Sequence, residues 1–428
     1  MAEIKGFQGL RFTEKAGTIE TLTCPPYDII PEAQRKAYLA ENPHNVIRLE
    51  LPKEGKNPYA QAGETLRAWM DEGIVARDDK ESLYIYEEEF EAHGARMSVK
   101  GFVCRVKIEE FAKRVVLPHE ETLSKAKTDR FNLMQATFCN FSQIYALYID
   151  EKRDAAKRID ALSAGAPDVE LTDQGGVIHR LWTVTDKAAI AALCGDLADN
   201  KLYIADGHHR YETALNFRDD CRKKGISKEG DDVDYVMMML TDMNHEGLVV
   251  FPTHRQVRDL EHFDAAAAMK ACEPYFELTE KTDVTSMESD LNALYLAGKK
   301  AFGFYIGGGR WTLMTLKDMA PVRALMTGKS EALQALDVSV LHTLVLEKLF
   351  GIDKENMANQ VNLTYTRSFD EAIEGVDSGA FQCSFILNPT RVSEILDVAA
   401  NGEKMPQKST YFYPKLITGL VMNKFETE

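Results

Sequence analysis

A short apolar run, Leu202–Ala205, meets a helical stretch, Tyr211–Lys224, across five residues that are polar or glycine. This abrupt change predicts a buried strand, a tight turn and a helix whose first amide groups are free. A free helix N-terminus carries partial positive charge and binds anions. The chain is therefore predicted to hold an anion site at this turn, whose residues are Asp206, Gly207, His208, His209 and Arg210.

The five turn residues bring different chemistry to such a site. Gly207 permits close approach of a ligand to the backbone, and Arg210 offers a forked donor for phosphate. His208 and His209 exchange protons near neutral pH, and Asp206 can accept a proton or hold a divalent cation. In the alternative interpretation Asp206 only caps the helix and the histidines are surface residues. Zinc binding by the histidine pair is disfavoured, because adjacent side chains point apart.

A second polar stretch, Pro118–Thr122, contains His119 and Glu120, which together could act as an acid and a base. The cations Lys125, Lys127 and Arg130 follow closely and could neutralise phosphates. The alternative is a solvated loop before a helix.

In the interpretation as a solvated loop, Thr128 and Asp129 form the cap of the following helix.

Arg255 closes a third stretch, at the end of a strand, which is where functional sites gather in sheets. In a fourth stretch, Met405–Lys415, the aromatic residues are interpreted as packing residues. Lys408 and Lys415 in that stretch are candidates for contacting a ligand.

Helical and strand patterns are mixed along the chain without strict alternation, so the fold class is predicted to be α+β. Two long strands are expected around His93-Gly94, and an apolar helix over Val338–Phe350. We expect two domains. Residues 1–257 would form the core that carries the turn, and residues 258–428 a smaller α+β domain.

The charge balance excludes some functions. Among 428 residues, 51 are Lys or Arg and 67 are Asp or Glu, which gives a net charge of −16. A protein that mainly coats nucleic acid would need the opposite balance to neutralise phosphates. No apolar run is long enough to span a bilayer, and the N-terminus lacks a signal core, so a cytoplasmic protein is expected. The seven scattered cysteines are expected to be reduced thiols.

Six separated segments resemble the domain-of-unknown-function family 1015. They occur in the order CPPYDII, LPHEETLSKAKTDR, KLYIADGHHRYETA, VVFPTHRQV, DVSVLHTLVLEKLFGI and MPQKSTYFYPKLITGLV. The segment DGHHR also resembles the signature of the ParB/sulfiredoxin superfamily, whose members bind nucleotide or phosphate at this turn. The resemblance implies a ParB/sulfiredoxin-like core. His208 stands where sulfiredoxins carry a cysteine, which argues against sulfinic-acid reduction.

Some members of that superfamily are free-serine kinases, so the resemblance implies phosphoryl transfer to a small hydroxyl substrate. The donor would be pyrophosphate, ADP or ATP, with Mg²⁺ as cofactor. Gly207, His208, His209 and Arg210 would hold the donor phosphates. Asp206 would activate the serine hydroxyl or hold the metal.

The resemblance also implies a separate acidic base, for which Glu120 and Asp28 are the candidates. Tyr27, Asp28 and Lys408 would contact the substrate. Electrostatic helpers that neutralise the transferred phosphoryl group would be His119, Lys127, Arg130, Arg255 and Lys408.

Two other functions stay open. One is a ParB-like nucleic-acid-binding or regulatory protein, against which the net charge of −16 weighs. The other is a nuclease or phosphohydrolase that uses the same anion site. A homodimer is expected only by analogy with the family that the sequence resembles.

Overall fold

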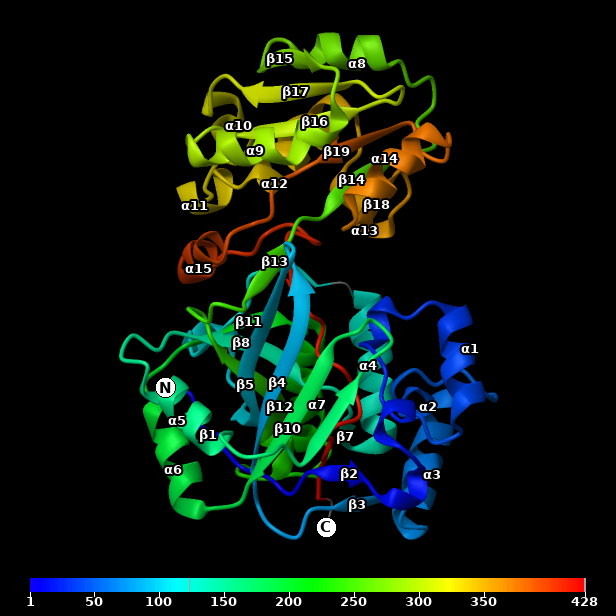
Figure 1. The fold of residues 1–428 in the computed structure, drawn as a ribbon, viewed down its shortest axis with the longest axis vertical. Helices are drawn as coiled ribbons and strands as arrows, with labels where there is room; N and C mark the ends of the chain where they lie inside the picture. Colours follow the sequence, from blue (N-terminus) through cyan, green and yellow to red (C-terminus); the bar gives the residue numbers. More distant parts are fainter. Residues whose placement is uncertain (123, 427–428) are drawn as a thin grey trace. The chain divides into compact units, whose positions relative to one another are not determined.

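The chain passes more than once between two compact units, which a computed structural model describes over residues 1–122 and 124–426 (Figure 1). The first unit comprises Met1–Pro118, Thr122–Val249 and Pro414–Glu428, and the second comprises His119–Glu121 and Val250–Tyr413. The sequence boundary was expected between residues 257 and 258. The structure instead divides the chain at residue 249 and returns the segment from Pro414 onward to the first unit.

A mixed sheet forms the centre of the first unit, and it confirms the α+β class. Its neighbours run both parallel and antiparallel: β11 is parallel to β6 and antiparallel to β8. The strands lie in the order β6 (Val116–Leu117), β11 (Leu202–Asp206), β8 (Ile144–Tyr148), β12 (Tyr235–Asp242), β5 (Ala95–Lys107), β4 (Leu83–Ala92), β10 (Ile178–Val184) and β9 (Val169–Thr172), and β1 (Ile4–Lys5) also pairs with β5.

The long hairpin of β4 and β5 confirms the strand pair expected around His93-Gly94. His93 has φ of 52° and Gly94 has φ of 72°, and a two-residue turn with both φ values positive matches the right-handed twist of the strands. The next strand, β12, is buried at every position and pairs along most of β5. This central layer therefore supplies a rigid support for the strand ends beside it.

Helices of the first unit cover this sheet and build a second apolar cluster around Trp69 and Leu66. Helix α4 packs against both α3 and α7. Thr128 and Asp129 lie inside α4, so the helix cap expected there is wrong. The helices are α1 (Glu32–Glu41), α2 (Ile47–Glu50), α3 (Pro58–Asp71), α4 (Ser124–Thr137), α5 (Asp154–Leu162), α6 (Lys187–Asp196) and α7 (His208–Lys223).

The C-terminal segment is tied into the first unit by backbone hydrogen bonds. Strand β21 (Asn423–Lys424) pairs with β7 (Cys139–Asn140), and Met422 exchanges two backbone hydrogen bonds with Leu10. Its side chains join the core as well, since Met422 is fully buried. These contacts explain why the segment that begins at Pro414 belongs to the first unit.

The second unit contains a fully antiparallel sheet flanked by short helices. Strands β16 (Ala301–Tyr305) and β17 (Trp311–Leu316) form a hairpin, and Gly307, Gly308 and Gly309 turn between them with positive φ. The strand order is β15 (Phe276–Lys281), β17 (Trp311–Leu316), β16 (Ala301–Tyr305), β19 (Cys383–Ile386), β14 (His254–Val257) and β18 (Leu363–Thr366).

The helices of this unit are short, and one of them is unusual. The apolar stretch predicted as one helix over Val338–Phe350 begins as α12 (Asp337–Val340) and continues as a π-helix over Leu341–Leu349. The others are α8 (Ala265–Cys272), α9 (Met287–Leu296), α10 (Ala320–Leu325), α11 (Glu331–Gln334), α13 (Lys354–Asn359), α14 (Phe369–Asp377) and α15 (Val392–Ala400).

Within the described residues, no helix combines the length and the apolar character needed to cross a membrane. All seven cysteines lie among those residues as free thiols, and only Cys194 is not buried. The expectation of reduced, mostly buried thiols is consistent with this arrangement.

Candidate functional site

The turn between β11 and α7 has the geometry of an open helix N-terminus. Leu202 and Ile204 anchor β11 in the core, and each such buried side chain contributes roughly 1.5–3 kcal/mol. Gly207 then adopts φ of 94° and acts as the helix cap without any side-chain capping bond. Asp206 therefore does not cap α7, and the first amide groups of the helix have no capping side chain. Helix α7 starts three residues earlier than expected, at His208.

Two cations hold the carboxylate of Asp206 at this turn. Nη2 of Arg210 donates to Oδ2 of Asp206 at 2.7 Å, and Nζ of Lys415 donates to the other oxygen. Nη1 of Arg210 donates to the carbonyl oxygen of Gln143 on the neighbouring chain segment, at 2.5 Å. The guanidinium therefore lies folded over Gly207, beside the first turn of α7.

These cations set the protonation state of Asp206. Burial alone would raise its pKa, but Lys415 and Arg210 outweigh burial and hold the pKa of the carboxyl well below its usual range. Asp206 is thus an ionised anchor for two cations and a poor proton acceptor. His208 is buried beside it, whereas His209 is half-buried.

The donor set at Asp206 does not fit the expected Mg²⁺ site. Magnesium prefers oxygen ligands in octahedral geometry, commonly one or two carboxylates with substrate phosphates. Here both oxygens of the carboxylate are already bonded to cationic groups. The described residues also contain no cluster of three or more His, Cys, Asp or Glu side chains suited to a metal ion. A metal at Asp206 stays a prediction from the resemblance alone.

A buried carboxylate, Glu50, lies near Arg210 and was not found by sequence reasoning. It ends α2 and is only 3% exposed. Ser142 donates to its Oε1 at 2.8 Å, and Nη1 of Arg130 lies 3.6 Å from its Oε2. Glu50, Arg130 and Arg210 line one cavity of about 30 Å³. Burial raises the pKa of Glu50, opposed by the charges of Arg130 and Arg210.

Arg130 and Tyr27, two of the predicted site residues, contact one another next to Glu50. The guanidinium carbon of Arg130 lies 3.9 Å above the ring of Tyr27. Its donors are used by the backbone of Glu50 and by Asp129. Burial raises the pKa of the Tyr27 phenol, and Arg130 and Arg210 oppose that effect. The structure thus brings Tyr27, Arg130 and Arg210 into one neighbourhood.

Lys127 and Asp28 also belong to the first unit. Nζ of Lys127 donates to Oε2 of Glu212, one turn into α7, at 2.8 Å. Thr122 donates to the same oxygen at 2.7 Å. Asp28 is exposed in a short 3₁₀ turn that includes Tyr27. The side chain of Lys125 lies outside the described part of the structure.

The remaining predicted residues gather in the second unit, around Lys408. Oε1 of Glu120 accepts the backbone N–H of Lys408 at 2.9 Å, and Nη2 of Arg255 donates to the carbonyl of Lys408 at 3.1 Å. His119 is fully buried, with Nε2 3.0 Å from the hydroxyl of Thr410. The side chain of Lys408 is itself exposed.

Arg255 has an internal role in this cluster. Arg255 is 1% exposed, and its guanidinium donates to His342, to the carbonyl of Thr253 and to the carbonyl of Lys408. Burial lowers the pKa of Arg255 to about 10, an effect that Tyr365 and Glu120 oppose. Arg255 was a candidate because it lies at the end of a strand. In the structure its N–H groups donate to acceptors within the protein.

Replacing Gly207 with alanine tests the turn directly. The new Cβ would lie 2.9 Å from two nitrogens of Arg210, so the guanidinium must move. The positive φ adds a cost of roughly 1–2 kcal/mol for an L residue. We expect about a tenfold loss of ligand affinity or turnover, measured together with the melting temperature.

Gly225→Ala is the matched control for this variant. Gly225 follows the other end of α7 with φ of 70°, and an added Cβ there would meet nothing within 4 Å. It carries a similar backbone cost without displacing a side chain. Equal losses in the two variants would show that the position of Arg210 is unimportant.

Comparison with known proteins identifies a family for most of the chain. Residues 4–339 match the family described as "Protein of unknown function (DUF1015)". No curated protein matches the chain.

Solved structures show a more distant likeness. A conserved hypothetical protein from Pyrococcus furiosus is 13% identical, with a TM-score of 0.34 over 72% of this chain and 92% of its own. A variant of free serine kinase in complex with ADP is 12% identical, with a TM-score of 0.37 over 72% and 89%. SbnI from Staphylococcus aureus, truncated at its C-terminus, is 10% identical, with a TM-score of 0.35 over 75% and 87%. Likeness at this level does not determine an activity.

Proposed function

We propose that this chain, which belongs to the DUF1015 family, is a small-molecule phosphotransferase that phosphorylates the hydroxyl of free L-serine. The observation that carries the proposal is the N-terminus of α7, which has no side-chain cap bond and lies beside Asp206, Lys415 and Arg210. A helix N-terminus with two cations next to it favours a phosphate-bearing ligand. The resemblance of DGHHR to phosphate- and nucleotide-binding turns supports the same chemistry. The donor would be pyrophosphate or a nucleotide.

Phosphoryl transfer depends mainly on positioning and charge neutralisation, which this turn can supply. Backbone N–H groups in the first turn of α7 would donate to oxygens of the phosphoryl donor. Arg210 and Lys415 would neutralise the charge on the transferred group. Asp206 would hold both cations in place, because its low pKa keeps it ionised.

The acceptor hydroxyl must lose its proton as its oxygen bonds to phosphorus and the donor's bridging bond breaks. Of the carboxylates near Arg210, Glu50 suits this step better than Asp206, because burial raises the pKa of Glu50 whereas cations lower that of Asp206. We therefore include Glu50 as the proton acceptor, in addition to Glu120 and Asp28, which stay candidates. Tyr27 would form part of the wall that contacts the substrate.

The roles of His119, Lys127, Arg130, Arg255 and Lys408 as electrostatic helpers stay predictions. Lys127 and Arg130 stand in the first unit with carboxylate partners of their own. A cytoplasmic location and a homodimer are further parts of the proposal that follow from the sequence.

Phosphorus NMR of the purified full chain tests the reaction. The protein is mixed with L-serine and magnesium, and in turn with pyrophosphate, ADP and ATP. We expect O-phosphoserine with one of these donors, and loss of that signal when serine is omitted.

The other outcomes separate the alternatives. Consumption of a donor without serine would indicate a phosphohydrolase instead. No phosphoserine with any of the three donors would remove the serine kinase proposal. A duplex-binding titration at several salt concentrations would detect nucleic-acid binding, which weakens steeply with salt.

A further inference from the structure

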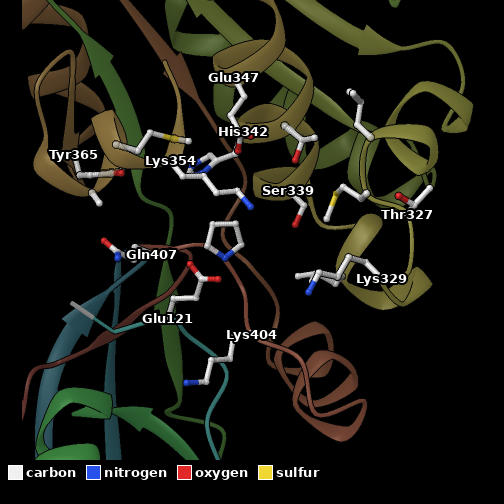
Figure 2. Close-up of a pocket in the computed structure, with 17 residues that line it drawn as sticks. Glu121, Thr327, Lys329, Ser339, His342, Glu347, Lys354, Tyr365, Lys404 and Gln407 are labelled. Carbon is white, nitrogen blue, oxygen red and sulfur yellow. The ribbon is translucent and has the colours of Figure 1, made fainter. Parts of the chain in front are cut away.

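The second unit contains a pocket of about 240 Å³ that the proposed reaction does not use (Figure 2). Its walls come from α12 and the π-helix that follows it, from α13, and from the segments near residues 325–333 and 404–407. Glu121 also lines it. Figure 2 shows Lys354 directed toward the same space as the carboxylates of Glu347 and Glu121.

The helix that forms one wall has an uncommon backbone. Over Leu341–Leu349 it is a π-helix, and the N–H of Phe350 bonds the carbonyl of Val345, five residues earlier, at 2.9 Å. π-helical turns are rare and occur frequently at functional sites. This wall presents Ser339, His342 and Glu347 to the pocket. The six-segment resemblance included this stretch, but the anion site of the first unit does not contain it.

Two buried polar groups face the pocket. The hydroxyl of Ser339 is fully buried and has no hydrogen-bond partner among the described residues. An unmade hydrogen bond inside a protein is unfavourable, so a ligand that bonds it would recover free energy. His342 is 4% exposed, and its Nε2 accepts from Nε of Arg255 at 3.2 Å. That bond makes His342 a neutral imidazole whose proton is on Nδ1.

The pocket is locally positive in a negative protein. Three lysines line it, Lys329, Lys354 and Lys404, against the two carboxylates Glu121 and Glu347. Among the lining residues, three positive charges less two negative charges leave +1, whereas the whole chain has −16. Nζ of Lys329 also lies 4.0 Å from Glu403, which does not line the pocket, so Lys354 and Lys404 are the lysines on which binding of a ligand would depend. Lys354 begins α13, its side chain is exposed, and its charge acts on the carboxylate of Glu347 and opposes the rise that burial causes in the pKa of Glu347.

We propose that this pocket binds a small phosphorylated amino acid. Lysines bind phosphate and carboxylate as point charges, and the glutamates would take the ammonium group of the same ligand. Leu325 and Met357 supply an apolar wall for a short carbon chain. The volume lies below the roughly 300–1,000 Å³ of pockets for drug-sized ligands, which favours a ligand of few atoms. The inference does not require phosphoryl transfer in the first unit.

Lysine acetylation of the full chain, read by mass spectrometry, tests the site. The probe is O-phospho-L-serine, compared with L-serine and with inorganic phosphate. We expect O-phosphoserine to slow the labelling of Lys354 and Lys404 about fivefold, with weaker protection by serine or phosphate alone. Lys299, exposed and outside the pocket, is the control and should label at an unchanged rate.

Three results would overturn the proposal. Absence of protection at Lys354 would remove the site. Equal protection by inorganic phosphate would remove the amino-acid part of the ligand. Equal slowing at Lys299 would show that O-phosphoserine consumes the acetylating reagent in solution and does not protect the pocket by binding.

Variants test which pocket residues bind the ligand, and whether binding in the second unit depends on the site in the first unit. Lys354→Met changes an exposed side chain and should abolish protection of Lys404 without altering the melting temperature. Ser339→Ala and His342→Gln should raise the O-phosphoserine concentration that gives half-maximal protection about tenfold. Arg210→Ala in the first unit should leave protection intact. Loss of protection in that variant would contradict an independent site, whether or not the phosphoryl transfer reaction is found.

Discussion

Arg210→Ala is expected to lower the rate of phosphoryl transfer by about a hundredfold or more, the usual cost of removing one preorganised donor to a developing charge. Arg210 joins the carboxylate of Asp206 to the backbone of Gln143 with bonds of 2.7 and 2.5 Å. Its removal takes a positive charge from the start of α7 and leaves Asp206 to Lys415 alone. Initial rates by phosphorus NMR, with the donor that supports turnover, measure the effect.

Two comparisons make the Arg210 result interpretable. Arg210→Lys should recover little activity, because one ammonium cannot make both bonds in the same geometry. Arg222→Ala is the matched control, since Arg222 lies at the other end of α7 and pairs with Asp234 at 2.6 Å. The Arg222→Ala variant should lose the ion pair with Asp234 but retain the wild-type rate of phosphoryl transfer. A full rate in Arg210→Ala, with an unchanged melting temperature, would exclude the turn as the donor site.

Glu50→Gln is expected to lower turnover by about 10²–10⁴-fold, the range for loss of a general base. Burial raises the pKa of Glu50, so its carboxyl takes up a proton at a higher pH than an ordinary glutamate. The wild-type rate should therefore fall as the pH drops through that raised pKa. In the variant the remaining rate should no longer show this acidic limb. A rate profile over pH measures both effects.

The fold should tolerate the Glu50→Gln exchange. A pKa raised on folding means that the ionised carboxyl costs stability as pH rises through the folded pKa, and the neutral amide avoids that cost. The amide oxygen of the glutamine can still accept from Ser142. Arg130 can still donate to the backbone carbonyl of residue 50. Glu64→Gln, on the exposed side of α3, is the control. An unaltered acidic limb in Glu50→Gln would assign the base to another carboxylate, with Glu120 and Asp28 tested next.

The turn could be found from sequence because its signal is local. Five consecutive residues change from a buried strand to a helix, and each contributes known chemistry. The α+β class and the hairpins follow from similar short-range patterns. The start of α7 was misplaced by three residues, because the left-handed conformation of Gly207 lets His208 enter the helix directly.

Other parts of the site depend on contacts that no local pattern reveals. Glu50 lies in the short sequence IRLE, which contains no recognised motif, and its polar contacts in the structure come from Ser142 and Arg130, 92 and 80 residues away. Lys415 was a candidate by residue type, but its bond to Asp206 spans 209 residues. The predicted cap at Thr128-Asp129 failed because the polar sequence before it continues the helix.

The bond between Lys415 and Asp206 has a consequence for the order in which the protein can become active during synthesis. The ribosome makes the turn at residues 206–210 about two hundred residues before it makes Lys415. Until then Arg210 is the only one of the two bonded cations present at Asp206, and the strand pairing of β21 with β7 has not formed. A nascent chain can therefore fold its central sheet early, whereas the charge balance of the turn is completed only when the last segment returns to it.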